Sequence, residues 1–326
     1  MRITVLGAGA WGTALARLLH QGQHQVTLWG HNPAHLADLQ RTRFNERYLP
    51  GIELPKELGL ESDIARAANQ AECVVVAVPS KAFRTVTSHL GSYPGLVVSV
   101  TKGIEYDTGL TMCGILSETM PKATCATLSG PSIAHEVARN IPTAIVAASP
   151  NPNAAKQVQE LFHRPTFRVY TSDDLLGVEL GGALKNVVAI AAGVCDGLGF
   201  GDNSKAALLT RAIAEIRRIG VARGAKPETF AGLSGLGDLT VTCFSKYSRN
   251  RNFGERLGRG EEIAHILFTS VHVAEGYHTA CSAHHLAQTL RVQAPIIDEI
   301  YAMLYEGKNV AKAVTDLISR DSKAEV

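Results

Sequence analysis

Short, continuous apolar runs alternate with helical or polar stretches through the first half of the chain. The apolar runs span residues 2–6, 25–29, 73–78, 96–100, 125–128 and 143–148. They do not alternate with polar positions, which is typical of strands buried on both faces of a sheet. Strands separated by helices predict a parallel, doubly wound α/β sheet.

Helical periodicity replaces this pattern from about residue 177, and strand-like runs give out. We therefore expect two domains, a Rossmann-like α/β domain over residues 1–176 and an all-helical domain over residues 177–326. A glycine-rich turn near residues 196–202 precedes a long amphipathic helix, for which Asn203 or Ser204 is the expected N-cap.

One predicted helix of the second domain, residues 180–195, is apolar on every side and carries a single charged residue, Lys185. Such a helix belongs in a protein core or in a bilayer. Lys185 and Asn186 divide the uncharged run into pieces shorter than the roughly 18 residues of a membrane span, so we expect burial and no membrane insertion. The Lys185 ammonium then either reaches the surface, pairs with a carboxylate, or takes part in a reaction.

Three glycines, Gly7, Gly9 and Gly12, lie between the first predicted strand and the helix that follows it. This G-x-G-x-x-G spacing in a strand, turn and helix setting is typical of dinucleotide binding. The first glycine makes the turn, the second lets the backbone approach a pyrophosphate, and the third lets the helix pack closely. A glycine turn that merely packs is the alternative.

The end of the second predicted strand bears on the choice of coenzyme. NAD-binding versions of the turn place an acidic residue there to bind the adenine ribose, whereas this chain has Gly30, His31 and Asn32. Without a carboxylate to repel a 2′-phosphate, the pocket is expected to admit NADPH and also NADH. His31 is either a partner for that phosphate or a plain surface histidine.

Ligands of doubly wound sheets collect at the carboxyl ends of the strands. The residues there include Lys102, which directly follows a buried strand, and Gly130 and Ser132, which open another loop. Lys102 is expected over the cofactor cleft, with an exposed loop lysine as the alternative. The Gly130 and Ser132 amides are expected to hold an anion or the cofactor, with tight-turn packing as the alternative.

The segment 232–254 of the second domain places Asp238 among glycines and gathers Ser248, Arg249, Asn250 and Arg251 without an obvious acidic partner. An arginine beside hydroxyl and amide donors suits a phosphate dianion, because a guanidinium can bond two oxygens at once. A solvated basic loop is the alternative.

Composition narrows the class of protein. Lys and Arg outnumber Asp and Glu by only 32 to 30, so no global basic field favours nucleic acid or an anionic membrane. The 6 cysteines include no C-x-x-C pair, which favours reduced thiols over disulfides or zinc. Arg2 leads directly into a strand and leaves no room for a signal peptide, so we expect a cytoplasmic protein. The scattered histidines give a metal site little support, and we expect none.

Several segments together carry a resemblance that spans essentially the whole chain. They are GAGAWGTALA at 7–16, NERYLPG at 45–51, TKGIE at 101–105, SGPSIAHEVA at 129–138, and the blocks at 184–211 and 235–251. The chain resembles the bacterial NAD(P)-dependent sn-glycerol-3-phosphate dehydrogenases. The resemblance implies reversible reduction of dihydroxyacetone phosphate to sn-glycerol 3-phosphate with NADPH or NADH, which supplies phospholipid synthesis.

The resemblance also implies roles for individual residues. The proton carrier falls on Lys185, with Lys102 and Asp238 as further catalytic residues. The substrate positions fall on Lys102, Gly130, Ser132, Lys185, Asp238, Ser248, Arg249 and Asn250. The cofactor positions fall on Gly7, Gly9, Ala10, Trp11, Gly12, His31, Tyr48, Lys102, Ala134, Arg249, Val273 and Glu275.

These residues support a mechanism in which Lys185 exchanges a proton with the substrate oxygen. A free lysine with a pKa of about 10.4 is a poor acid–base catalyst at neutral pH, but burial and a second cation lower the value. We expect Lys102 to be that cation and Asp238 to orient Lys185.

These residues leave two rival interpretations open. Related two-domain reductases act on hydroxy acids, 3-hydroxyacyl thioesters or ketopantoate, and these do not need the cluster at 248–251. A nicotinamide-binding sensor that catalyses nothing has no use for Lys185 or Asp238.

Apolar helices in the second domain favour a homodimer.

Overall fold

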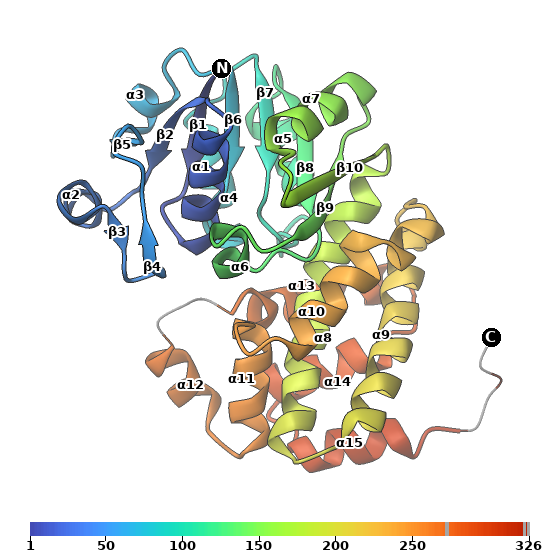
Figure 1. Ribbon diagram of the computed structural model, residues 1–326. Coiled ribbons are helices and arrows are strands. Elements are labelled where there is room, and N and C mark those ends of the chain that lie inside the picture. The colour runs from blue at the N-terminus through green and yellow to red at the C-terminus, as the bar shows by residue number, and fades with distance from the viewer. Residues whose placement is uncertain (271–273, 322–323, 325–326) are drawn as a thin grey trace. The chain divides into compact units, whose positions relative to one another are not determined.

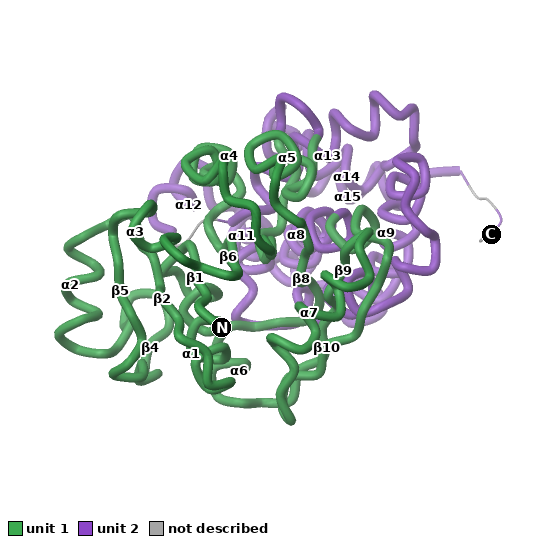
Figure 2. The backbone as a smooth tube through the Cα atoms, turned by 90° about the horizontal axis from the view of Figure 1, so that it is seen from above, with its two compact units in different colours: residues 1–105, 110–179 green, residues 106–109, 180–326 purple. Residues whose placement is uncertain are grey.

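The computed structural model describes residues 1–270, 274–321 and 324, and the chain forms two compact units (Figures 1 and 2). Unit 1 comprises residues 1–105 and 110–179, and unit 2 comprises residues 106–109 and 180–326. The predicted fold class, a doubly wound sheet followed by an all-helical region, is confirmed. The division lies within a helix, between Glu179 and Leu180, whereas the change of sequence pattern suggested a boundary after residue 176.

The sheet of unit 1 contains eight described strands in the order β10-β9-β8-β7-β6-β1-β2-β5. Their bounds are β1 Arg2–Leu6, β2 Gln25–Trp29, β5 Gly59–Glu61, β6 Cys73–Val76, β7 Leu96–Ser99, β8 Thr124–Ser129, β9 Thr143–Ala148 and β10 Phe167–Ser172. The chain runs outward from β1 to β2 and then returns to the other side at β6. The reversal of strand order therefore falls between β1 and β6, which is where open α/β sheets bind ligands.

The expectation of a wholly parallel sheet was wrong at one pair of strands. β8 and β9 are antiparallel, while the other neighbouring pairs of this sheet are parallel. A parallel connection needs a crossover, usually a full helix. The segment between these strands contains only the five-residue helix α6 (Ala134–Ala138), so β9 starts from the edge where β8 ends.

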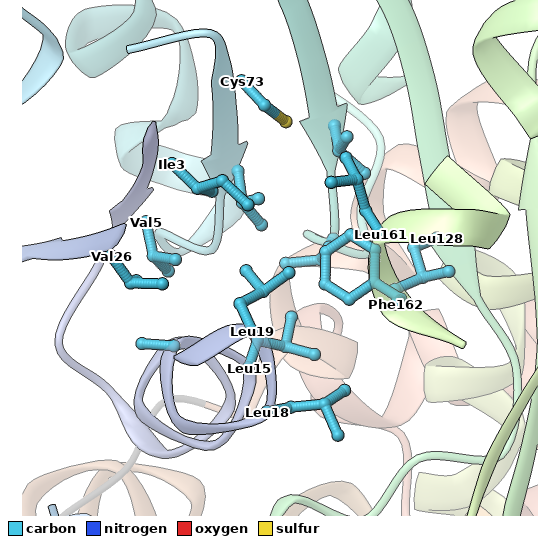
Figure 3. Close-up of a cluster of buried hydrophobic side chains, with 14 of the residues drawn as sticks. Ile3, Val5, Leu15, Leu18, Leu19, Val26, Cys73, Leu128, Leu161 and Phe162 are labelled. Atoms are coloured by element: carbon cyan, nitrogen blue, oxygen red, sulfur yellow. The ribbon is translucent and has the colours of Figure 1, made fainter. Parts of the chain in front are cut away.

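Helices cover both faces of this sheet. On one face, α1 (Ala10–Gln21) and α7 (Pro152–Phe162) contribute to a core in which Leu15, Leu19 and Phe162 pack against strand residues (Figure 3). The helix α2 (Pro33–Thr42) adds two leucines to this core. On the opposite face lie α3 (Ile64–Ala68), α4 (Ser80–Ser88) and α5 (Met112–Thr119). Replacing a buried phenylalanine such as Phe162 by alanine typically lowers the free energy of unfolding by about 3–5 kcal/mol. The packing of these helices on the sheet therefore contributes much of the stability of unit 1.

Unit 2 is helical throughout its described part. Its elements are α8 Leu175–Gly197, α9 Asp202–Ala222, a 3₁₀ turn η1 Pro227–Ala231, a π turn η2 Leu233–Gly237, α10 Asp238–Phe244, α11 Arg249–Gly258, α12 Ile263–Thr269, α13 Glu275–Thr289, α14 Pro295–Tyr305 and α15 Val310–Ile318. The first residues of α8 belong to unit 1. The expected N-cap of α9 was wrong, because the helix begins at Asp202 after Gly201. Asp202 instead places a negative charge in the first turn, which favours a helix start.

The helix that carries Lys185, α8, packs unusually closely against α11. A Cβ on Gly193 would lie 1.9 Å from the Arg251 carbonyl oxygen, and a Cβ on Gly254 would lie 2.0 Å from the Ile190 carbonyl oxygen. The two backbones are therefore in direct contact at these glycines. This approach brings the residues at the start of α11 beside the middle of α8.

Helix α8 is the one helix of the described chain that is long and apolar enough to cross a membrane. Of its most apolar 18-residue window, 89% is buried within the protein. A core helix of a soluble protein has these properties, and Lys185 on it is 6% exposed.

Candidate functional site

Lys185 forms a buried polar cluster with two residues of α10. Its Nζ lies 2.8 Å from Asp238 Oδ1 and donates a hydrogen bond to Thr242 Oγ1 at 2.6 Å. Asp238 is 1% exposed and Thr242 is 9% exposed. Asp238 and Thr242 are four residues apart on one helix and so face the same side.

The cluster has a defined orientation because Thr242 is tied to its own helix. Its hydroxyl lies 2.6 Å from the Asp238 carbonyl oxygen and 3.2 Å from Asp238 Oδ1. One hydroxyl hydrogen cannot serve both oxygens fully, while the oxygen of the hydroxyl accepts from Lys185. Asp238 was expected beside Lys185 from the sequence, whereas Thr242 was not, although its i, i+4 spacing from Asp238 was available as a signal.

A neutral amide network adjoins this cluster along α8. Asn250 Nδ2 donates to Asn186 Oδ1 at 2.9 Å, and Asn250 Oδ1 accepts from the Gly276 backbone N–H at 2.9 Å. Both asparagines are buried. These bonds join the start of α11 and the start of α13 to α8. Asn250 Nδ2 carries a second hydrogen, which is available to a further partner.

The cluster at 248–251 divides into residues with different surroundings. Ser248 caps α11, accepting from the Arg251 backbone N–H at 3.2 Å. Arg249 is an exposed residue, yet desolvation lowers the pKa of its guanidinium, and the nearby Glu275 carboxylate opposes that shift. Arg249 is therefore a partly desolvated cation next in sequence to the buried Asn250.

The expectation that this cluster lacks an acidic partner was wrong for Arg251. Its Nε lies 2.6 Å from Asp196 Oδ2, and its Nη1 lies 3.0 Å from Glu255 Oε2. Lys205 also pairs with Asp196. Asp196 is at the C-terminal end of α8, 55 positions before Arg251, so its role was invisible in the local sequence. Arg251 holds α11 in place.

In unit 1, the three glycines of the turn have distinct surroundings. Gly7 has φ +119°, and a Cβ there would lie 2.6 Å from the Ala77 carbonyl oxygen. A Cβ on Gly12 would lie 1.9 Å from the Gly7 carbonyl oxygen, whereas a Cβ on Gly9 would meet nothing within 4 Å. The first and third glycines are therefore required by the fold, and the second leaves open space in front of the backbone.

The start of α1 fits the pyrophosphate of a dinucleotide. Gly9 is its N-cap and makes no side-chain capping bond, and the first turn contains no acidic residue. The unsatisfied N–H groups and the helix dipole there favour an anion. Ala10 and Trp11 form the first turn of this helix, and Trp11 and Ala134 each pack against a small buried apolar cluster that includes Ala14 and Ala138.

Other predicted residues of unit 1 form two groups. Lys102 Nζ and Ser132 Oγ both donate to the Gly130 carbonyl oxygen, at 3.2 and 2.9 Å. The half-buried Tyr48 ring lies 5.3 Å from the His35 ring. His31 is exposed just after β2. Val273 lies outside the described residues. The cofactor and substrate roles of all these residues remain predictions.

The cysteine next to Thr242 in the sequence is not suited to act as a nucleophile. Burial raises the pKa of Cys243, the neighbour of Thr242, to about 12, so it is a neutral thiol at physiological pH. Among the described residues, no group of three or more His, Cys, Asp or Glu side chains is placed to hold a metal ion.

Comparison with known proteins decides the family. Residues 2–155 match the profile of the NAD-dependent glycerol-3-phosphate dehydrogenase N-terminus, and residues 174–315 match that of the C-terminus. The chain belongs to the NAD-dependent glycerol-3-phosphate dehydrogenase family.

Full-length relatives agree with this family. A glycerol-3-phosphate dehydrogenase [NAD(P)+] of Citrifermentans bemidjiense is 48% identical over 330 residues, covering 99% of this chain and 98% of that protein. The crystal structure of glycerol-3-phosphate dehydrogenase from Coxiella burnetii superimposes with a TM-score of 0.95 at 36% identity, covering 98% of this chain and 99% of that chain.

A reductase of the rival kind is much more distant. A putative 2-dehydropantoate 2-reductase from Enterococcus faecalis has a TM-score of 0.53 at 15% identity, which shows a shared fold alone. The family members therefore provide the better guide to the chemistry of this chain.

The surroundings of the glycines predict different outcomes for two alanine substitutions. Gly9→Ala fits the folded backbone and should leave the melting temperature unchanged or slightly higher, because alanine restricts the unfolded chain. Its methyl group occupies the open space, so NADPH affinity should fall by about tenfold or more. Gly12→Ala should instead lower the melting temperature, because its methyl overlaps the Gly7 carbonyl.

Calorimetric titration with NADPH and thermal unfolding of both variants check this prediction. Unchanged NADPH affinity in a folded Gly9→Ala protein would contradict the pyrophosphate site assigned to the start of α1.

Proposed function

We propose that this chain catalyses reversible reduction of dihydroxyacetone phosphate to sn-glycerol 3-phosphate with NADPH or NADH, supplying glycerophospholipid synthesis. The observation that carries the proposal is the buried cluster of Lys185, Asp238 and Thr242 in a chain of this dehydrogenase family. A sensor that only binds a nicotinamide has no need for a buried ammonium of this kind. The family membership and the cluster therefore both favour an enzyme.

The nicotinamide coenzyme supplies and accepts the hydride when it is bound. Reduction of a ketone leaves negative charge on the carbonyl oxygen, and the protein must stabilise that charge and deliver a proton. Lys185 serves both needs, giving its Nζ proton to the substrate oxygen in reduction and taking it back in oxidation. Asp238 and Thr242 hold the ammonium in one position, so little reorganisation is needed when the charge develops.

Substrate phosphate is assigned to the start of α11. Arg249 offers a guanidinium that matches a phosphate dianion, with Asn250 and the Ser248 hydroxyl beside it. Binding the phosphate away from the reacting carbon positions the ketone and contributes to the rate. Lys102, Gly130 and Ser132 of unit 1 are assigned to the remaining substrate and cofactor contacts.

The direct test of the proposed function is loss of NADPH absorbance when dihydroxyacetone phosphate is added to the purified protein. Parallel assays with NADH establish the coenzyme preference, which the residues at 30–32 leave open because they include no carboxylate. Ketopantoate and a 3-ketoacyl thioester, the oxidised partner of a 3-hydroxyacyl thioester, serve as competing substrates for reduction. Turnover of either in preference to dihydroxyacetone phosphate would refute the proposal.

The proposal includes a cytoplasmic homodimer. Support for the location comes from the free state of all six cysteines, as expected in a reducing compartment. Support for the dimer comes from large exposed apolar side chains of unit 2, Leu236, Phe244 and Tyr247. Light scattering at micromolar concentration should give twice the chain mass, and a monomer mass would remove the dimer from the proposal.

Substitution of Arg249 tests the phosphate assignment. Arg249→Ala should raise the KM for dihydroxyacetone phosphate by about 10- to 100-fold, because a charge-assisted hydrogen bond to phosphate is lost. The variant should also lose preference for dihydroxyacetone phosphate over dihydroxyacetone, which has no phosphate. Steady-state kinetics with both substrates measure this change.

Arg259→Ala is the matched control, since Arg259 follows the same helix and pairs with Glu255 at the surface. Exposed ion pairs contribute roughly 0–1 kcal/mol to the free energy of unfolding, so Arg259→Ala should have the stability and the KM of the unmodified enzyme. An unchanged KM in Arg249→Ala would show that the phosphate binds elsewhere.

A further inference from the structure

The glycine turn of unit 1 is held by a residue from a different element, Asn45. Asn45 lies in a small hairpin formed by β3 (Phe44–Asn45) and β4 (Leu49–Glu53) and is 0% exposed. Its Nδ2 donates to the Ala8 carbonyl oxygen at 3.1 Å and to Thr13 Oγ1 at 2.8 Å. Both hydrogens of the side-chain amide are thereby directed at the turn.

The orientation of this amide follows from its partners. The Ala8 carbonyl can only accept, so the nitrogen of Asn45 must face it and the oxygen must point elsewhere. That oxygen, Oδ1, is buried and has no hydrogen-bond partner among the described residues. A buried acceptor without a hydrogen bond costs stability, and here that cost accompanies the two hydrogen bonds that the amide makes to the turn.

The two bonds fix both ends of the anion-binding turn. Ala8 lies between Gly7 and Gly9, and Thr13 lies in the first part of α1, where its backbone N–H donates to the Gly9 carbonyl oxygen at 3.0 Å. The Ala8 carbonyl oxygen is the negative end of a peptide dipole. Its hydrogen bond to Asn45 keeps this oxygen directed away from the open space in front of Gly9. The adjacent N–H groups are then the groups that meet a phosphate.

The hairpin is itself braced against α1. Leu49 and Ile52 of the hairpin pack with Ala14 of α1 and with Ala138 of α6. The Tyr48 backbone N–H donates to the Asn45 carbonyl oxygen at 3.1 Å. Asn45 is therefore anchored through its backbone and neighbours, and its side chain can hold the turn at a fixed distance.

We infer that Asn45 is a positioning residue for coenzyme binding, which acts through the Ala8 carbonyl and the Thr13 hydroxyl to preorganise the turn for the pyrophosphate. Asn45 need not touch the coenzyme for this role. The inference rests on the nicotinamide coenzyme of the proposed function. It predicts that loss of the Asn45 amide weakens binding of the pyrophosphate specifically.

The main variant is Asn45→Leu, which approximates the shape of asparagine and removes both hydrogen bonds. Calorimetric titration should show Kd values for NADPH and for ADP-ribose that rise by about tenfold or more, as expected for the loss of one to two net hydrogen bonds. The Kd for adenosine 2′-monophosphate, which has no pyrophosphate, should stay within about twofold. At saturating NADPH, the KM for dihydroxyacetone phosphate should be unchanged.

A second variant, Thr13→Val, removes only one of the two partners and should weaken ADP-ribose binding in the same direction but less. It decides the question if Asn45→Leu does not fold. Asn151→Ala is the matched control, because Asn151 caps α7 in the same unit and its side chain accepts from the Asn153 and Ala154 backbone N–H groups. Its loss of a cap should lower the melting temperature by a few degrees without changing the ADP-ribose Kd.

Three results would overturn the inference. The first is an ADP-ribose Kd within twofold of the unmodified protein in whichever of the two variants folds. The second is an equal loss for ADP-ribose and adenosine 2′-monophosphate, which would indicate general distortion of unit 1. The third is no binding of ADP-ribose by the unmodified protein. Failure of the unmodified protein to reduce dihydroxyacetone phosphate while it binds ADP-ribose would count against the proposed function alone.

Discussion

A buried ammonium and a buried carboxylate in contact, those of Lys185 and Asp238, are the constraint on which unit 2 depends. Removing either partner of such a pair typically costs about 3–5 kcal/mol, because the other charge is left unpaired. The pair therefore requires α8 and α10 to stay in register, and Thr242 adds a second contact between them. The close glycine packing of α8 against α11 and the Asn186–Asn250 bond extend that requirement to the start of α11.

Rigidity of this kind suits the chemistry assigned to the site. A proton donor that is already oriented, in surroundings that exclude water, stabilises developing charge without reorganisation. In unit 1 the oriented groups are neutral. The turn at Gly7–Gly12 presents backbone N–H groups, and Asn45 holds the Ala8 carbonyl oxygen of that turn in place. In both units, a residue that does not react determines where the reacting or binding group lies.

Much of this arrangement could be predicted from the sequence, because it depends on local patterns. Continuous apolar runs identified all six inner strands of the sheet, and the glycine spacing identified the start of α1. The short strand β5, the β3–β4 hairpin and β10 lack a continuous apolar run, so the sequence pattern did not predict them. The antiparallel pairing of β9 with β8, the Arg251–Asp196 ion pair and the Asn45 hydrogen bonds all join residues distant in sequence. A single sequence carries no signal for such pairings. Thr242 was missed despite a local signal.

The central claim, that Lys185 carries the proton, is tested most directly by chemical rescue of Lys185→Ala with added primary amines. The variant should bind NADPH normally but lose about 10² to 10⁴ in turnover of dihydroxyacetone phosphate. Small amines should restore activity, and the rescue rate constant of each protonated amine should rise as its pKa falls. Near-normal turnover of the variant without amine, or rescue that is independent of amine pKa, would contradict the account.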